Sequence, residues 1–421
     1  MSEPLVRVAA APLAAAGWSR ADGLPAGRAA GPGSRPGSRP GTDGRRRVLH
    51  VISTLLPGGT ELSMLRLIRS MDPNAWTFRV AWLMGEPALG REIEQATGAA
   101  PLAIGLRGKA DPRALLRLRR VVRDERIDLV HTHMDLADYY GAAAARLTRG
   151  TGLICTKENA DEFRTRRTWK RPPFLLLEHL SYAAADAVIA VSHGLADFLA
   201  RAEGLPRRKT VVIENGVDIA AAAEAPPRRA ARALLGLPGE APLLGTVGRL
   251  AAQKGQRDLV RALPAIRTAV PGARLVIAGD GPLRGELEEE ARRAGVAGEV
   301  HFLGHRNDVP VILSALDLFV LPSLWEGLPL ALLEAMSMSL PVVATRAVGI
   351  EETVSDGVEG LLVPCGDSDA LARAAARVLG DHHLALGFGT AGRRRVVARH
   401  SLAAVADRID ALYRRVLGGE P

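Results

Sequence analysis

Short apolar runs alternate with amphipathic segments along most of this chain. The apolar runs predict strands at 48–52, 78–83, 102–105, 127–132, 152–156, 187–191 and 210–214. Segments with helical periodicity lie between them, at 60–71, 112–125, 136–148, 173–184 and 193–203. Alternation of this kind is typical of a parallel, doubly wound α/β sheet with helices on both faces.

A second series of the same kind begins at Leu243. It predicts strands at 243–247, 273–278, 299–303, 317–321, 341–345 and 360–363, and helices at 367–379, 384–398 and 402–417. We therefore predict two Rossmann-like domains, at 46–218 and 243–400, with the site in a cleft between them. Residues 219–242 are expected to form a linker with one short helix, and 401–421 a C-terminal helix that packs back on the first domain.

Composition adds limits to this picture. Residues 1–45 are rich in Ala, Gly, Pro and Arg, so we expect a disordered tail. No apolar run approaches the roughly 18 residues of a membrane-spanning helix. Cys155 and Cys365 lie far apart without metal-ligand spacing, which favours reduced thiols in a reducing compartment, the cytoplasm.

The net charge of +9 is concentrated at the start of the chain. The first 47 residues hold eight arginines and three acids, a surplus of five positive charges. The overall charge is therefore weak support for a nucleic-acid partner, and no nucleic-acid motif accompanies it. A second basic stretch, 164–171, mixes arginines with Trp169. It is typical either of contact with an anionic membrane or of a solvated loop.

Two carboxylates mark the most informative stretch of the second series. Glu326 follows the predicted strand 317–321, and Glu334 lies about two turns further along, in a helical run from Leu330 to Met338. Ligands of open α/β sheets bind at this edge of the sheet, where a helix N-terminus attracts anions. Alone, Glu326 could equally be a capping acid and Glu334 a solvated helix residue.

Other loops of the predicted strands carry cations, glycines and histidines. Arg249 and Lys254, just after Gly248, could clamp a diphosphate or be two solvated cations. Gly279 permits close backbone approach or a plain turn. In the first series the residues at corresponding strand ends are Gly58-Gly59 and His131-Thr-His133. We expect one of the two histidines to pack and His133 to project into the cleft, and we predict no metal because no further ligand stands at useful spacing.

Taken in order, these motifs resemble the retaining, nucleotide-sugar-dependent glycosyltransferases of the "group 1" family, which have the GT-B fold. The resemblance covers about residues 47–417. It rests on the ordered set Gly58-Gly59, His131-Thr-His133, Ala190-Val-Ser192, Glu214-Asn-Gly-Val-Asp218, Gly248-Arg-Leu with Lys254-Gly255, Gly279-Asp-Gly281, the Glu326/Glu334 pair and Pro341-Val-Val-Ala-Thr345.

The resemblance implies roles for individual donor-site residues. Arg249 and Lys254 match the pair that holds the donor diphosphate, with Gly248 and Gly279 on the adjoining loops. Glu326 matches the acid that faces the donor sugar, beside the backbone of Gly327 and Leu328. Glu334 matches the acid on the ribose hydroxyls.

Two further roles fall in the first domain. His133 matches the histidine near the anomeric carbon, and Gly59 matches the glycine loop near the phosphates. His133, Glu326, Arg249 and Lys254 are the residues expected to take part in catalysis. One departure is visible: where the family often has Gly-Gly-x-Pro-Glu, this chain has Val348-Gly-Ile-Glu351-Glu352.

The implied enzyme is a hexosyltransferase of retaining type, active in the synthesis of a polysaccharide, glycolipid or other glycoconjugate. Its acceptor would be a carbohydrate or a lipid-linked sugar, met at the inner face of the membrane, and it would need no cofactor. A nucleotide-sugar epimerase and a non-catalytic partner subunit remain as alternatives. A nicotinamide dehydrogenase is disfavoured, because neither half carries GxGxxG with a later ribose acid.

Overall fold

The computed structural model describes residues 44–108, 110–133, 135–159, 171–202, 204–205 and 207–418. Nearly all of the predicted disordered tail, and residues 164–170 of the basic stretch, therefore lie outside the described residues. None of the described helices is both long and apolar enough to cross a membrane.

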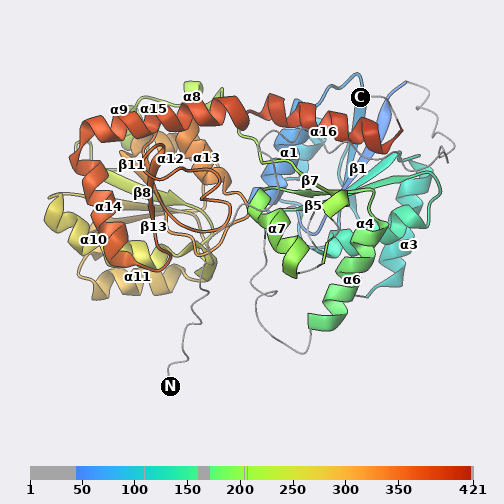
Figure 1. Ribbon diagram of the computed structural model, residues 1–421, viewed down its shortest axis with the longest axis horizontal. Coiled ribbons are helices and arrows are strands. Elements are labelled where there is room, and N and C mark those ends of the chain that lie inside the picture. The colour runs from blue at the N-terminus through green and yellow to red at the C-terminus, as the bar shows by residue number, and fades with distance from the viewer. Residues whose placement is uncertain are drawn as a thin grey trace. The chain divides into compact units, whose positions relative to one another are not determined.

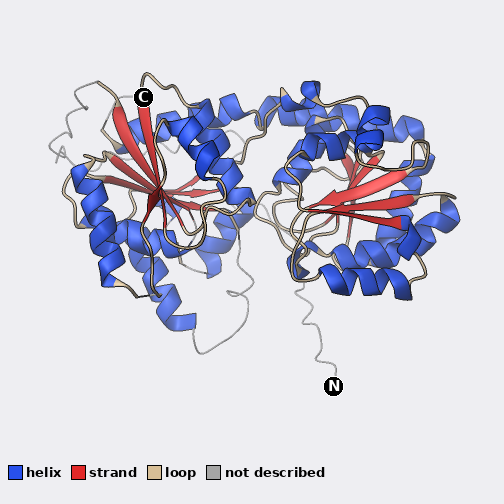
Figure 2. Ribbon diagram, turned by 180° about the vertical axis from the view of Figure 1, so that it is seen from behind, coloured by secondary structure: helices blue, strands red, loops and turns tan. Residues whose placement is uncertain are grey.

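The first sheet has seven parallel strands in the order β3-β2-β1-β4-β5-β6-β7. They are β1 (Arg46–Ile52), β2 (Trp76–Trp82), β3 (Leu102–Ala103), β4 (Leu129–His133), β5 (Gly152–Lys157), β6 (Ala187–Ala190) and β7 (Thr210–Val212). The helices are α1 (Gly59–Ser70), α2 (Gly90–Thr97), α3 (Pro112–Asp124), α4 (Asp135–Arg146), α6 (Arg171–Ala184) and α7 (His193–Ala202). Figures 1 and 2 show these helices on both faces of the sheet.

The second sheet has six parallel strands in the order β10-β9-β8-β11-β12-β13. They are β8 (Leu243–Val247), β9 (Arg274–Ala278), β10 (Val300–Gly304), β11 (Leu318–Leu321), β12 (Val342–Thr345) and β13 (Gly360–Val363). Its helices are α10 (Gln256–Ala269), α11 (Arg284–Arg293), α12 (Val309–Ala315), α13 (Leu330–Ser337), α14 (Ser368–Gly380) and α15 (His382–Arg399). The two sheets confirm the prediction of two doubly wound halves.

The segment between the sheets contains two helices rather than the single one expected, α8 (Ala221–Glu224) and α9 (Arg228–Leu234). Helix α9 is held to the second half, because the guanidinium of the buried Arg232 pairs with Asp317 at 2.7 Å and donates to the carbonyl of Ala315. Residues after Ala225 therefore belong structurally to the second half.

The last helix, α16 (Leu402–Val416), packs on the first sheet. Its residues Ile409, Leu412 and Tyr413 share a buried cluster with strands β1 and β4. Trp76 of β2 donates from its indole nitrogen to Asp410 at 2.6 Å. The chain thus returns to the first half after completing the second, and α15 and α16 follow one another along one side of the protein (Figure 1).

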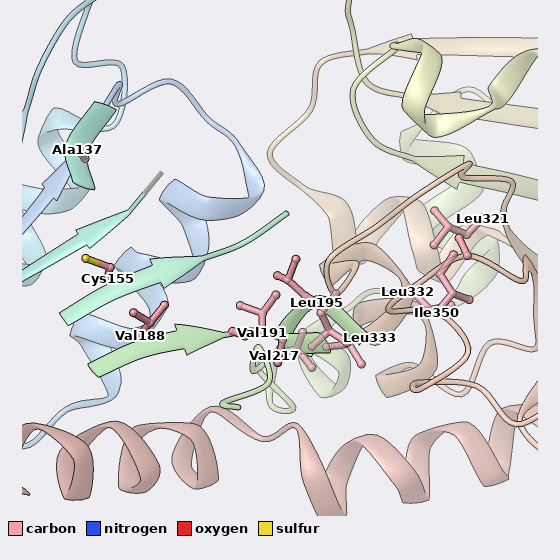
Figure 3. Packing of buried hydrophobic residues seen from close by; sticks show 14 of the residues in the cluster. Ala137, Cys155, Val188, Val191, Leu195, Val217, Leu321, Leu332, Leu333 and Ile350 are labelled. Atoms are coloured by element: carbon pink, nitrogen blue, oxygen red, sulfur yellow. The ribbon is translucent and has the colours of Figure 1, made fainter. Parts of the chain in front are cut away.

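A single buried apolar cluster contains residues of both halves. Leu195 and Val217 of the first half and Leu333 and Ile350 of the second belong to it. Figure 3 shows Leu195, Val217 and Leu333 near one another. The two halves therefore share apolar packing as well as polar contacts.

Candidate functional site

Each sheet has one point where its strand order reverses direction. It lies between β1 and β4 in the first sheet and between β8 and β11 in the second. Ligands of open parallel sheets bind outside the carboxyl ends of strands at such points. His133 is the last residue of β4, and Gly59, Arg249 and Glu326 follow β1, β8 and β11, so the topology brings the predicted residues to the expected edges.

Lys254 and Glu326 form the central contact on the second sheet. The Lys254 Nζ lies 2.6 Å from the Glu326 Oε1, although the residues are 72 positions apart. The Ser323 hydroxyl donates to the same oxygen at 2.6 Å. Glu326 is only 5% exposed, so the lysine provides the charge that a buried carboxylate needs. Two residues predicted on separate loops thus meet directly.

The glycines of this half shape the loops around that pair. A Cβ on Gly279 would lie 2.0 Å from the carbonyl oxygen of Gly248, and Gly279 has φ +132. Its N–H donates to the Gly304 carbonyl at 2.7 Å. Gly279 therefore allows two backbone segments to approach closely, which is one of the two roles expected for it. Arg249 is exposed beside these loops, and no described residue pairs with its guanidinium group.

Two helix N-termini come together at the boundary between the halves. Helix α1 begins at Gly59 and helix α13 at Leu330, and a Cβ on Gly59 would lie 4.0 Å from the Leu330 Cδ1. Neither N-cap, Gly58 or Pro329, supplies a side-chain hydrogen bond to its helix. On α1 the N–H of Glu61 is already bonded to its own buried carboxylate, and on α13 the N–H of Leu332 donates to the Pro329 carbonyl. The first two N–H groups of each helix remain to meet an anion, which the helix dipoles also favour.

Glu334 also lies at this boundary, but it already has a partner that the sequence pattern missed. The Arg66 Nη2 on α1 lies 2.6 Å from the Glu334 Oε1 on α13. The other terminal nitrogen of Arg66, Nη1, is buried and makes no hydrogen bond with the described residues. Nearby, the Asn215 amide donates to the carbonyl of Leu328 at 3.5 Å. Arg66 therefore holds one oxygen of the predicted ribose acid.

Glu334→Ala is expected to weaken the binding of a nucleoside diphosphate about tenfold, because a hydrogen bond to a charged group contributes about 1.5–3 kcal/mol. Calorimetric titration with UDP, GDP and ADP measures this. Arg66→Ala should have a smaller effect, since a partly exposed ion pair contributes about 0–1 kcal/mol. Glu288→Ala, a partly exposed acid paired with Arg284 in the same half, is the control. Unchanged nucleotide affinity in Glu334→Ala would reject the ribose contact.

His133 is not placed as expected. It is 3% exposed and lies in a group of three imidazoles with His131 and His50. The His50 Nδ1 and the His133 Nε2 are 2.9 Å apart, and burial lowers the pKa of His133 to about 3. His133 is therefore buried at the wall of a small cavity and does not project into an open cleft. It is a neutral ring, and its Nδ1 is buried without a hydrogen-bond partner among the described residues.

We predicted no metal because we expected no further ligand near His131 and His133, and the group of three histidines shows that this reason is wrong. His50 of β1 is the further ligand thought to be missing, and one nitrogen from each ring lies within 4.8 Å of the others. The residues fit an ion poorly, however. Both ring nitrogens of His131 are engaged at 2.6 Å, by the hydroxyls of Tyr413 and Thr156. Metal-free chemistry stays a prediction.

A partly open cavity of about 40 Å³ adjoins the histidines. Its polar lining includes His133, Glu158, Glu214 and Asn215. Burial raises the pKa of Glu158 to about 7. The carbonyl of Glu158 also lies so close to Gly327 that a Cβ there would be 1.9 Å from its oxygen. Gly327, predicted to face the donor sugar, therefore also touches the first half.

A second contact between the halves involves the loop where the sequence departs from the resembled family. The Glu352 carboxylate accepts N–H bonds from His193, at 2.7 Å, and from Gly194, the first residues of α7. Burial raises the pKa of this carboxyl. Gly349 of the same loop packs on the carbonyl of Gly327. The sequence could have suggested that the N-terminus of α7 is capped. It could not show that the capping carboxylate, Glu352, belongs to the other half.

Comparison with known proteins identifies both halves. A family model described as "Glycosyl transferases group 1" matches residues 241–381, and one described as "Glycosyltransferase Family 4" matches residues 57–221. EpsF of Bacillus subtilis, which is named as a glycosyltransferase, is 30% identical over 79% of this chain and 88% of its own length. An α-1,3-galactosyltransferase of Escherichia coli is 31% identical over 72% of this chain and 79% of its own.

Solved structures show the same architecture. HepE of Anabaena superposes with a TM-score of 0.77 at 24% identity, over 88% of this chain and all of that one. Sucrose-phosphate synthase of Thermosynechococcus elongatus gives a TM-score of 0.75 at 25% identity, over 89% and 100%. The two-sheet architecture is therefore the GT-B fold, and this chain belongs to the group 1 glycosyltransferases.

Proposed function

We propose that this glycosyltransferase moves a sugar from a nucleoside diphosphate sugar to an acceptor hydroxyl, with retention of the anomeric configuration. The observation that carries the proposal is the convergence of two helix N-termini that have no N-cap side chain, at Gly59 and Leu330, with the Lys254–Glu326 pair and with Glu334 on α13. This arrangement suits a diphosphate flanked by a sugar and a ribose.

Relatives support the donor class and leave the nucleotide open. The name of the E. coli relative specifies UDP-galactose as donor and a diphosphoundecaprenol-linked sugar as acceptor. A Mycobacterium tuberculosis relative, 38% identical over 38% of this chain, is named as GDP-mannose-dependent. By analogy we propose an acceptor carried on a lipid, used in polysaccharide or glycoconjugate synthesis at the cytoplasmic face of the membrane.

The proposed mechanism follows from where charge develops. As the bond from the anomeric carbon to the phosphate oxygen breaks, negative charge grows on the leaving diphosphate. Lys254, Arg249 and the N–H groups of α1 and α13 would stabilise that charge. Glu326, fixed by Lys254 and Ser323, would hold a hydroxyl of the donor sugar. The acceptor oxygen would attack from the same side, and its proton would pass to the leaving phosphate.

The neutral ring of His133 fits this scheme as a hydrogen-bonding group. With its pKa lowered to about 3, it stays uncharged throughout the physiological range and adds no repulsion to an oxocarbenium-like centre. No metal is needed in the proposal, because the protein cations and helix N-termini supply the positive charge that an ion would provide.

A donor screen tests the proposal. Purified protein is incubated with UDP-, GDP- and ADP-sugars, with and without EDTA, and release of the nucleoside diphosphate is followed. We expect release from one donor, unaffected by EDTA and lost in Arg249→Ala. Silence from every donor, without any donor-dependent shift in melting temperature, would contradict the proposal. Release abolished by EDTA would overturn its metal-free part.

A further inference from the structure

The outer layer of helices on one face of the first sheet exposes an unusual number of leucines. Leu176, Leu177 and Leu180 of α6, Leu116 of α3 and Leu147 after α4 are each between 45 and 60% exposed. On α6 the three lie on one face of the helix, while Glu178, Ser181 and Tyr182 on the other face are buried. The three leucines of α6 form one exposed apolar stripe, and contiguous apolar patches mark interaction sites.

Arginines line helix α3, which belongs to the same layer of helices. Positions 113, 116, 120 and 123 of α3 share one helix face, and they hold Arg113, Leu116, Arg120 and Arg123, all exposed. Arg119 and Arg149 are exposed nearby. The acid on this face, Asp124, is already bonded to Arg123 at 2.8 Å. The face is therefore both apolar and strongly positive.

The elements that carry this face are in contact. Helix α4 packs against α3 on one side and α6 on the other. The Arg119 Nε donates to the Leu147 carbonyl at 3.2 Å, and Arg146 donates to the Ala184 carbonyl at the end of α6. Figure 1 shows α3, α4 and α6 in the same part of the first half. The leucines and arginines thus share one layer of helices, the α3/α6 face.

We propose that the α3/α6 face docks on an anionic lipid membrane, with Leu176, Leu177 and Leu180 entering the headgroup region and the arginines of α3 on the lipid phosphates. Amphipathic helices that lie in a membrane interface combine the same two features. Basic side chains gain from the negative surface potential of the bilayer. This proposal rests on the proposed function and names the residues that would hold the enzyme at the membrane.

Other occupants fit the face less well. A second copy of the chain, related by a two-fold axis, would offer the arginines of α3 only the arginines or leucines of the same face, and no anionic partner. A nucleic acid would use the arginines, but leucines offer it neither stacking nor hydrogen bonds, and single-strand binders use aromatic platforms. An anionic bilayer uses both kinds of side chain, so the charge and the apolar area together favour lipid.

Flotation of the full chain with vesicles tests the inference without requiring activity. We expect the protein to float with vesicles containing phosphatidylglycerol and far less with phosphatidylcholine alone. Arg113→Gln with Arg120→Gln should lower binding to the anionic vesicles about 25-fold, from roughly fivefold for each cation. Leu176→Gln with Leu180→Gln should lower it at least about tenfold.

Matched substitutions elsewhere serve as the control. Leu386→Gln with Arg373→Gln changes an exposed leucine and arginine of the second half and should leave flotation unchanged. Failure of the wild type to float, or equal flotation of all variants, would overturn the inference even if the donor screen succeeds. Loss of self-association in the leucine variant, with flotation intact, would assign the face to a second copy instead.

Discussion

Lys254→Ala is expected to lower kcat/KM for the donor by about 10³-fold. Removal of one preorganised group that stabilises developing negative charge typically costs 10²- to 10³-fold in rate. Here the change also leaves Glu326, which is 5% exposed, without its cation. The affinity for a nucleoside diphosphate should fall more than that for the corresponding monophosphate, because Lys254 is proposed to hold the diphosphate.

The control for Lys254 is its neighbour Arg257. This arginine is exposed three positions further along and pairs with Glu286, so Arg257→Ala should keep nearly full turnover. Circular dichroism and the melting temperature show whether each variant remains folded. A folded Lys254→Ala variant that keeps turnover within tenfold of the wild type would reject the phosphate role.

The order of strands and helices was predictable because buried parallel strands are short continuous apolar runs. Strands β11 and β12 begin and end within a residue of the predicted 317–321 and 341–345. Helix α2 was missed because its pattern is weak: it has eight residues, no side-chain N-cap and only Ile93 buried. Strand β3 was predicted too long, since only Leu102 and Ala103 pair with β2.

The site was predictable as a set of loops but not as a set of contacts. Lys254 and Glu326 could each be named from strand ends, whereas their direct contact depends on β8 and β11 being neighbours in the sheet. Arg66 gives no sequence signal, because it is one of two arginines on an amphipathic helix, and it meets Glu334 only across the two halves. His50 was missed because its partners lie on a strand about eighty residues later.

Gly327→Ala is expected to lower kcat about 10²-fold while leaving nucleotide binding nearly intact. The added methyl group would lie 1.9 Å from the Glu158 carbonyl oxygen and 2.8 Å from its carbon. Both neighbours are backbone atoms, so the loop after β11 or the end of β5 must move. A displacement of about 1 Å at a reacting centre can cost about 10²-fold in rate. The nucleotide contacts proposed for Glu334 and Lys254 involve other residues and should survive.

The effect of Gly327→Ala separates the contact between Gly327 and Glu158 from donor binding. Gly298→Ala is the matched control, because a Cβ there meets nothing within 4 Å. Single-turnover rates and calorimetric affinity for the nucleoside diphosphate would be compared in both variants. A fall in affinity equal to the fall in kcat would mean that Gly327 serves only the nucleotide. Wild-type turnover would mean that the contact between Gly327 and Glu158 is not required during the reaction.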